Sequence, residues 1–202
     1  MDLNQQQDRE LLEAVRRFAL DHEHPYLAQF KPSMLAWGDS WEPVEPVDLP
    51  VSAVLPEAAE RATSNTQLLL QTFARHSHRL RWEQSYRKQD DLVPDTMLDA
   101  YGFVEIIGLR GPFVSDRIRA GIAIWGAHLD YPQHQHQAEE IYVLLAGSAE
   151  FSLAGDQAQT RRTGDLVYVE SNRRHGFRTG EESLVVYYLW QAGDLRQTSN
   201  FD

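Results

Sequence analysis

Hydrophobic residues change their spacing near Gly102, from a helical to an alternating pattern. Before this glycine they recur every three or four residues over 4–22, where Asn4 supplies an N-cap, and again over 56–86. A short third stretch over 95–101 ends at Gly102, a residue type that often follows a helix. The pattern therefore predicts a mainly helical N-terminal half.

A proline-rich segment interrupts this helical half between residues 31 and 56. Pro25 is expected to end the first helix, because the residue before a proline avoids the α conformation. The prolines of 31–56 argue against helix interior and central strand alike, since proline fixes φ and lacks the backbone donor. The segment also carries Trp37 and Trp41. We expect a loop that packs across the domain and that acts as a lid if it lies near a pocket.

After Gly102, apolar and polar residues alternate in short runs separated by turn residues. The runs predict strands at 103–109, 118–125, 140–146, 149–153, 166–170 and 183–191. Short strands at this spacing are typical of a small β-sandwich or barrel, and barrel closure removes exposed strand edges. We therefore expect a helical region over 1–101, including the loop 31–56, packed on a β-barrel over 102–202.

Composition and charge exclude several classes of protein. The chain has 202 residues and a net charge of −11, which disfavours binding to a nucleic-acid backbone or to an anionic membrane surface. It has no cysteine, which excludes disulfides, thiolate metal sites and a Cys nucleophile. No apolar run approaches the ~20 residues of a membrane span, and the polar N-terminus does not resemble a signal peptide. A cytoplasmic protein with a small-molecule partner is the default expectation, and a homodimer is left open.

Two histidines and a glutamate lie close together in the motif His134-x-His136-x3-Glu140. Side chains alternate along a strand, so both imidazoles can face one ion. Glu140 and Tyr142 lie at even spacing from them, so a strand there directs acid and phenol to the same side. Imidazole nitrogens and a carboxylate suit one divalent transition metal ion, such as Zn, Fe or Mn. A further ligand must come from elsewhere, and His175 is the candidate.

A second H-x-H pair, His76 and His78, falls within the helical pattern. Residues two apart on a helix point about 200° away from each other, so this pair cannot chelate as a strand pair does. We expect both side chains on a solvated helix surface.

The spacing of the first histidine motif resembles that of the cupin superfamily. The first cupin motif runs H-x-H, three or four residues, E, six residues and G, and it is matched by His134, His136, Glu140 and Gly147. The second motif is matched at Gly164 and His175, whereas Glu170 and Asn172 replace its usual Pro and Gly. The resemblance implies a cupin-type β-barrel, a double-stranded β-helix or jelly roll, with the metal in its mouth.

A narrower resemblance involves the bacterial cupin-type dimethylsulfoniopropionate (DMSP) lyases. It rests on Y-x2-H-x-H-x3-E-x-Y, on H-x-F about 30 residues later and on the segment Y-Y-L-W-Q-A-G-D-L. The resemblance implies a carbon-sulfur lyase that cleaves DMSP to dimethyl sulfide and acrylate. By position it implies metal ligands at His136, Glu140 and His175 with His134 completing the shell, a catalytic tyrosine at Tyr142, a second pocket tyrosine at Tyr131 and a pocket tryptophan at Trp190.

The chemistry of this elimination agrees with those residue types. The proton α to the carboxylate must be removed, and a metal ion on the carboxylate stabilises the resulting negative charge. Tyr142, two residues from Glu140, can act as the base if the cation lowers its pKa. Aromatic faces can hold the sulfonium by cation–π attraction, and the candidates are Trp190, Tyr131, Tyr188, Trp37 and Trp41.

Other functions are compatible with the same motif. The chain could be another metal-dependent cupin enzyme, such as a dioxygenase or a sugar isomerase, or a DMSP-lyase-like cupin with a different small substrate. A non-catalytic binding cupin is a further alternative, against which the intact ligand set argues. The sequence does not identify the metal, because the same ligands take several ions.

Overall fold

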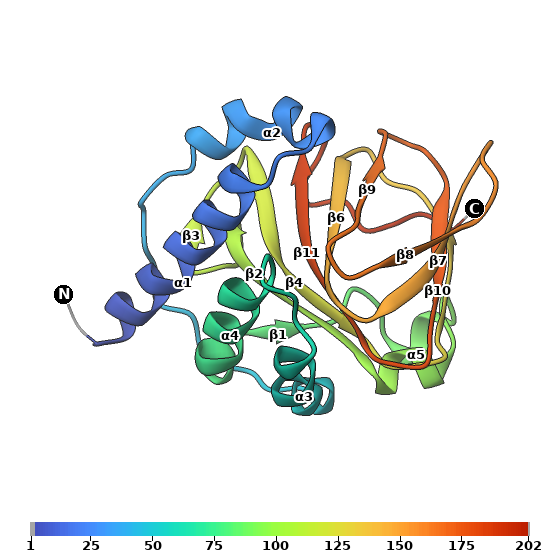
Figure 1. Cartoon of the computed structure of the whole chain (residues 1–202), viewed down its shortest axis with the longest axis horizontal. Helices are drawn as coiled ribbons and strands as arrows, with labels where there is room; N and C mark the ends of the chain where they lie inside the picture. Colours follow the sequence, from blue (N-terminus) through green and yellow to red (C-terminus); the bar gives the residue numbers. More distant parts are fainter. Residues whose placement is uncertain (1–2, 202) are drawn as a thin grey trace.

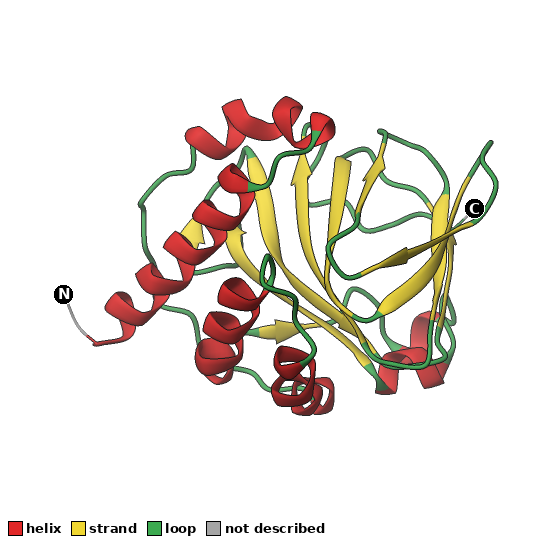
Figure 2. Ribbon diagram, in the orientation of Figure 1, coloured by secondary structure: helices red, strands yellow, loops and turns green. Residues whose placement is uncertain are grey.

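Two mostly antiparallel sheets form the body of the protein in the computed structural model, which describes residues 3–201 (Figures 1 and 2). The larger sheet has the order β1-β2-β4-β11-β6-β9, with β3 added to β2, and the smaller has the order β5-β10-β7-β8. The larger sheet comprises β1 (Trp82–Glu83), β2 (Tyr101–Gly108), β3 (Phe113–Val114), β4 (Ile118–Trp125), β6 (Glu139–Ala146), β9 (Leu166–Val169) and β11 (Leu184–Gln191). The smaller comprises β5 (Asp130–His134), β7 (Ser148–Leu153), β8 (Gln159–Arg162) and β10 (His175–Thr179).

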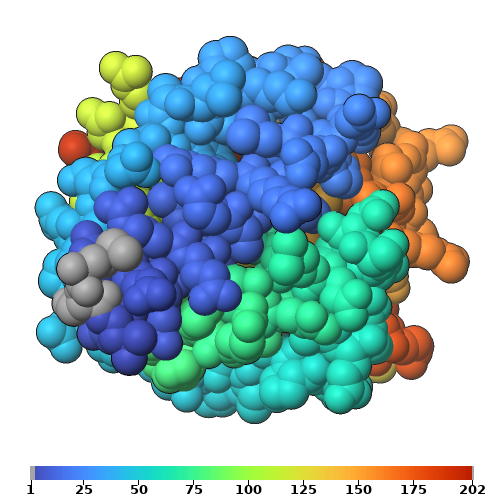
Figure 3. Space-filling view, turned by 60° about the vertical axis from the view of Figure 1, so that its left-hand side comes forward, coloured from blue at the N-terminus to red at the C-terminus, as the bar shows by residue number. Residues whose placement is uncertain are grey.

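Helices cover the outer face of the larger sheet (Figures 1 and 3). They are α1 (Leu3–Asp21), α2 (Pro25–Leu35), α3 (Leu55–Glu60) and α4 (Gln67–His76), whereas the short α5 (Asp95–Asp99) directly precedes β2. Three 3₁₀ turns complete the set at Pro50–Val54, Ser77–Arg79 and Lys88–Asp90. The prediction of a cupin-type β-barrel with N-terminal helices is confirmed, whereas the division at residue 101 stays a prediction. Within the described residues, no helix has the length and apolar character that crossing a membrane requires.

The larger sheet separates two hydrophobic cores. On its outer face Leu11, Phe30 and Leu70 of the helices pack with Ile122 and Tyr187 of the sheet. On its inner face a second cluster, which includes Tyr142, Phe151 and Phe177, lies between the two sheets. Because both faces are covered, β11 is a nearly continuous apolar run in which every residue except the last is buried.

Part of the predicted proline-rich loop is helical. Pro25 does not simply end the first helix: it opens α2, and Pro32 lies inside that helix. A proline is well tolerated in the first turn, where its missing N–H has no helical partner. Leu27, Phe30 and Met34 are buried against the sheet, and this packing outweighs the loss of one hydrogen bond at Pro32. The expectation of a loop throughout 31–56 is therefore wrong at both ends of the segment.

The predicted helical stretch 56–86 is divided into shorter elements. The turn between α3 and α4 is closed by Thr66, whose Oγ1 accepts from the backbone N–H of Thr63 at 3.1 Å. Beyond α4 the chain enters β1, where Trp82 pairs with Val104 of β2, so the helix does not reach Tyr86. Trp82 is an apolar position of an edge strand and Leu80 lies just before it, an arrangement that a short window cannot distinguish from helix.

One of the two helical histidines is buried, contrary to expectation. His76 is 7% exposed, and its Nε2 lies 3.2 Å from Glu10 Oε2 of α1. His78 is exposed, as predicted. The error at His76 arises because α4 packs on α1, and His76 lies three residues after Phe73 and seven after Leu69, on the buried face of α4.

Candidate active site

The register of the larger sheet aligns the inward-facing residues of the candidate site in rows. In one row Glu140 of β6 lies beside Trp190 of β11, which lies beside Arg119 of β4. Two residues along each strand, Tyr142 lies beside Tyr188. Because side chains alternate along a strand, these rows face the smaller sheet together. Three strands thus project polar and aromatic groups into one space: the Glu140 carboxylate, the Tyr142 and Tyr188 phenols, the Trp190 indole and the Arg119 guanidinium.

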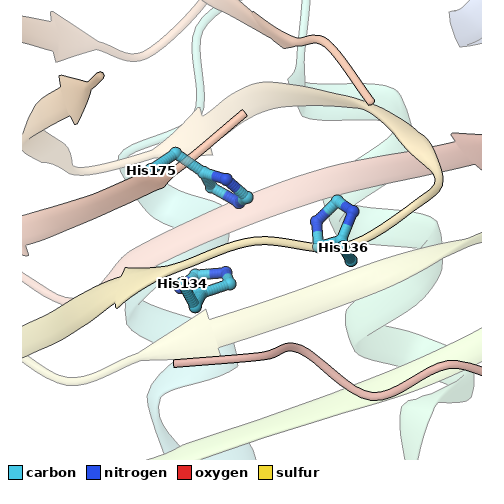
Figure 4. Close-up of side chains that lie close together, drawn as sticks. All are labelled: His134, His136 and His175. Atoms are coloured by element: carbon cyan, nitrogen blue, oxygen red, sulfur yellow. The ribbon is translucent and has the colours of Figure 1, made fainter. Parts of the chain in front are cut away.

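Three buried histidines complete this space from the smaller sheet. His134 ends β5, His175 begins β10, and the two are paired across these strands. His136 follows in the connection to β6. One ring nitrogen of each lies within 4.8 Å of the others, and no side chain of the three is more than 2% exposed. Figure 4 shows the three rings pointing toward one another.

Backbone carbonyls fix the orientation of all three rings. Nδ1 of His134 donates to Pro132 O at 2.8 Å, Nδ1 of His136 to Ala138 O at 3.0 Å and Nδ1 of His175 to Arg173 O at 2.9 Å. A carbonyl only accepts, so Nδ1 carries a proton in each ring, and Nε2 is the nitrogen left available as a ligand. Metal-ligating histidines take this arrangement, because the second nitrogen is held by an outer hydrogen bond.

Glu140 lies between two of these imidazoles. Its Oε2 is 2.9 Å from His136 Nε2 and 3.5 Å from His175 Nε2, and its side chain is 3% exposed. Burial alone would raise the pKa of Glu140, but its contacts with His136 and His175 outweigh burial and hold that pKa well below its usual range. Burial and the neighbouring His175 lower the pKa of His134 to about 3. At neutral pH the site therefore contains a carboxylate and a neutral His134.

This donor set fits a divalent transition metal ion. His175 Nε2 is buried and makes no well-formed hydrogen bond within residues 3–201, so an electrophile would satisfy it. Imidazole nitrogens with a carboxylate suit Zn, Fe or Mn. The three histidines form a group that can bind such an ion, and Glu140 as a further ligand stays a prediction.

Two tyrosines lie next to this group. The Tyr131 ring centroid is 4.3 Å from that of His134, and its hydroxyl is 2.8 Å from the hydroxyl of Tyr86. Burial raises the pKa of Tyr131 well above its ordinary value. Burial, followed by the Glu140 carboxylate, raises the pKa of Tyr142 in the same way. Both phenols are therefore protonated at neutral pH unless a positive charge is added beside them.

A cavity of about 130 Å³ joins the histidine group to the aromatic residues. Its lining includes His134, Glu140, Tyr131, Tyr142, Tyr188 and Trp190, whose roles at the site stay predictions. Trp37 and Trp41 lie elsewhere. Trp37 is buried in the outer core, and Trp41 donates through Nε1 to Asp8 Oδ2 of α1 at 2.9 Å. Their expected contact with substrate, and the lid role of their segment, are therefore not supported, because packing on the helices holds them on the other face of the sheet.

Sequence reasoning missed three parts of the cavity. Arg119 lines it, and a single charge within the otherwise apolar run I-R-A-G-I-A-I-W was an available signal. Tyr86 reaches Tyr131 from a segment expected to be helical. Residues 196–199 also line the cavity, and Phe201 packs 5.6 Å from the His134 ring. This last segment has no periodicity from which its position could be inferred.

Comparison with known proteins gives consistent matches. A model of the dimethylsulfoniopropionate lyase family matches residues 38–186. Dimethylsulfoniopropionate lyase DddQ of Ruegeria pomeroyi is 34% identical over 179 residues, which cover 88% of this chain and 86% of that protein. The crystal structure of DddQ from this organism superimposes with a TM-score of 0.79 at 31% identity over 95% of both chains. A crystal structure reported with the DMSP lyases RdDddP and RnDddQII shares the fold, with a TM-score of 0.86 at 24% identity over 98% of this chain and 99% of that chain.

Proposed function

The chain belongs to the dimethylsulfoniopropionate lyase family, and from this premise we propose that it cleaves DMSP to dimethyl sulfide and acrylate. The observation that carries the proposal is the grouping of His134, His136 and His175 beside a cavity whose lining includes His134, Glu140, Tyr131 and Tyr142. The elimination requires ligands for an ion, an oxygen that accepts a proton and an aromatic wall around the substrate.

His134, His136 and His175 would hold the metal ion through Nε2, with Glu140 beside them. When bound, a divalent ion supplies Lewis-acid stabilisation for the substrate carboxylate and a positive charge that lowers the pKa of a nearby phenol. The carbonyl partners of the three Nδ1 atoms keep the rings in the ligating orientation, so little reorganisation accompanies binding.

Tyr142 is the proposed base. Its hydroxyl is buried beside Glu140, two residues away on the same face of β6, so it lies next to the ion-binding group. The phenolate oxygen takes the proton from the carbon α to the carboxylate, the C–C double bond forms, and the β-carbon–sulfur bond breaks. The sulfonium leaves as neutral dimethyl sulfide, so no general acid is needed. Tyr142 then returns the proton to solvent.

Tyr131 is the proposed positioning group for the substrate. Its ring packs on His134, and its hydroxyl is fixed by Tyr86, so the oxygen has a defined place in the cavity. The surrounding buried rings exclude water, which strengthens each electrostatic contact with the substrate.

The decisive experiment is headspace gas chromatography of the purified, metal-loaded protein with DMSP. We expect dimethyl sulfide and acrylate in equal amounts, and loss of both after chelation. His175→Ala should lower metal content and activity together, whereas His78→Ala, an exposed histidine remote from the motif, should change neither. Metal-loaded protein that releases no dimethyl sulfide at any pH from 5 to 9 would contradict the proposed substrate.

A further inference from the structure

Arg119 is a largely buried cation inside the aromatic cavity. Its guanidinium carbon lies 5.0 Å from the ring centroid of Trp190, 5.9 Å from that of Tyr188 and 5.1 Å from that of Phe103. Its Nε is 2.7 Å from Glu105 Oε2, and the side chains of Arg119 and Glu105 are only 11% and 3% exposed. The reaction proposed above uses neither residue.

The rings of Trp190 and Tyr188 therefore already carry a cation. A sulfonium on the same rings would lie close to the guanidinium, and like charges repel more strongly where water is excluded. The His136 ring also packs on Trp190, with centroids 4.1 Å apart. Although both rings line the cavity, they are poorly suited to hold a second positive group.

Arg119 instead offers donors to an anion. Glu105 contacts the guanidinium at Nε, so the two Nη N–H groups can donate to a ligand in the cavity, which Arg119 lines. Arginine binds carboxylates through such a pair of N–H groups. In the sheet, Trp190 separates Arg119 from Glu140, so the guanidinium and the histidine group share one end of the cavity.

Away from Arg119, the wall of the cavity is formed by the rings of Tyr101, Trp125 and Tyr131, and Arg119 stacks on none of these three. Trp125 closes β4, the strand that Arg119 begins, and its ring lies 5.2 Å from Tyr101 and 5.5 Å from Tyr131. All three rings line the cavity. Rings of this kind attract quaternary and sulfonium cations through their faces.

We propose that Arg119, held by Glu105, sets the orientation of the substrate. The carboxylate lies at the end formed by Arg119 and the histidine group, and the sulfonium lies against Tyr101, Trp125 and Tyr131. This orientation rests on the proposed lyase function. In this orientation the sulfonium does not bind Trp190 and Tyr188, the rings that the sequence suggested.

The test compares two carboxylates of equal shape, 3-(trimethylammonio)propionate and 4,4-dimethylpentanoate, which differ in the charge of the head group. Their affinities for the metal-loaded protein are measured by isothermal titration calorimetry, so the result does not depend on turnover. We expect the cationic ligand to bind roughly tenfold more tightly to the wild type, as cation–π attraction in a dry site predicts. Equal affinities would overturn the proposal.

Variants at three positions locate the two ends of the ligand. Trp125→Leu should abolish the preference for the cationic ligand, and Trp125→Phe, which keeps a ring in the core, should reduce it in the same direction. Trp190→Leu should keep the preference. Arg119→Gln should weaken both ligands by a similar factor, roughly tenfold or more, with partial recovery in Arg119→Lys.

The opposite results would each contradict the orientation. Loss of the preference in Trp190→Leu but not in the Trp125 variants would place the cation on Trp190. Unchanged affinity of both ligands in Arg119→Gln would exclude Arg119 as a carboxylate partner. If the wild type fails to cleave DMSP yet shows the expected binding pattern, the proposed function fails while the polarity of the cavity stands.

Discussion

The proposed role of Tyr142 as a base requires a positive charge beside its phenol, and the neighbouring residues that affect its pKa do not provide one. Burial and Glu140 both raise the pKa of its phenol, which makes it a weaker acid than free tyrosine. Only a positive charge beside the oxygen makes the phenolate accessible near neutral pH. At the scale of the residue, the proposed base and the metal site are therefore one functional unit.

Replacement of Tyr142 by Phe keeps the ring and removes the oxygen that takes the proton. We expect kcat to fall by at least ~10²-fold with metal content near wild type, because a general base is lost. Steady-state kinetics and elemental analysis provide the measurement. Tyr131→Phe, the control, should mainly raise KM. Near-wild-type turnover by Tyr142→Phe would exclude Tyr142 as the base.

Removal of the metal should make the protein sensitive to acid. The pKa of His134 is lowered from 6.5 to about 3 in the folded state, so the unfolded state binds more protons between these values. Stability therefore decreases as the pH falls from about 6.5 toward 3. Thermal unfolding of the chelated protein should show this slope, and His134→Gln should reduce it. An unchanged slope in that variant would assign the acid sensitivity to other groups.

At the scale of the element, β4 packs closely against β2 and β11 because Gly121 of β4 has no side chain. Gly121 lies between Glu105 of β2 and Tyr188 of β11 in the row that contains Tyr142. A Cβ atom at this position would lie 1.8 Å from Val104 O and 2.9 Å from the Tyr188 hydroxyl. The absence of a side chain thus leaves space for the phenol of Tyr188 and for the hydrogen bond it donates to Val104 O at 3.3 Å.

Gly121→Ala should therefore destabilise the protein by roughly 2 kcal/mol or more, because β2 and the Tyr188 side chain of β11 must move away from β4. Chemical denaturation measures the change. Gly38→Ala is the matched control, since a Cβ atom there has no neighbour nearer than 3.9 Å. Equal effects of the two substitutions would show that the steric contact at Gly121 contributes little to stability.

The alternating pattern was sufficient to predict six strands (β2, β4, β6, β7, β9 and β11) and the directions of Glu140 and Tyr142, because both follow from local geometry. It did not predict β8 or β10, which have no regular apolar alternation. The histidine spacing likewise placed His134 and His136 together. The helix opened by Pro25 and the burial of His76 were not predictable in this way, since tertiary packing overrides local preference. Arg119 joins the site only through its pairing with Trp190, a contact distant in sequence.

At the scale of the whole molecule, the cavity is closed by segments from both parts of the chain. Tyr86 comes from the connection after β1, and Phe201 packs 5.2 Å from its ring while also lying against His134. Asn200 forms a bridge with Gln135, which precedes His136. The mouth of the site thus depends on the segment 196–201 remaining in place.

Phe201→Ala should loosen this closure. We expect KM for DMSP to rise several-fold with a smaller change in kcat, because the base and the metal ligands are unaffected while water gains access to the cavity. Hydrogen exchange of residues 134–136 should increase in parallel. Leu109→Ala, a truncation of an exposed apolar residue, serves as the control. Kinetics identical to wild type would indicate that the segment does not close the site during turnover.

The place of β11 in the larger sheet has a consequence for the newly made chain. β4 and β6 are synthesised before β11, but they do not pair with each other, because β11 lies between them in the sheet. Until β11 leaves the ribosome, two long apolar strands have unpaired edges and the row containing Glu140 and Arg119 cannot assemble. The nascent protein must therefore delay folding of this sheet, and chaperones that shield strand edges should determine its yield in cells.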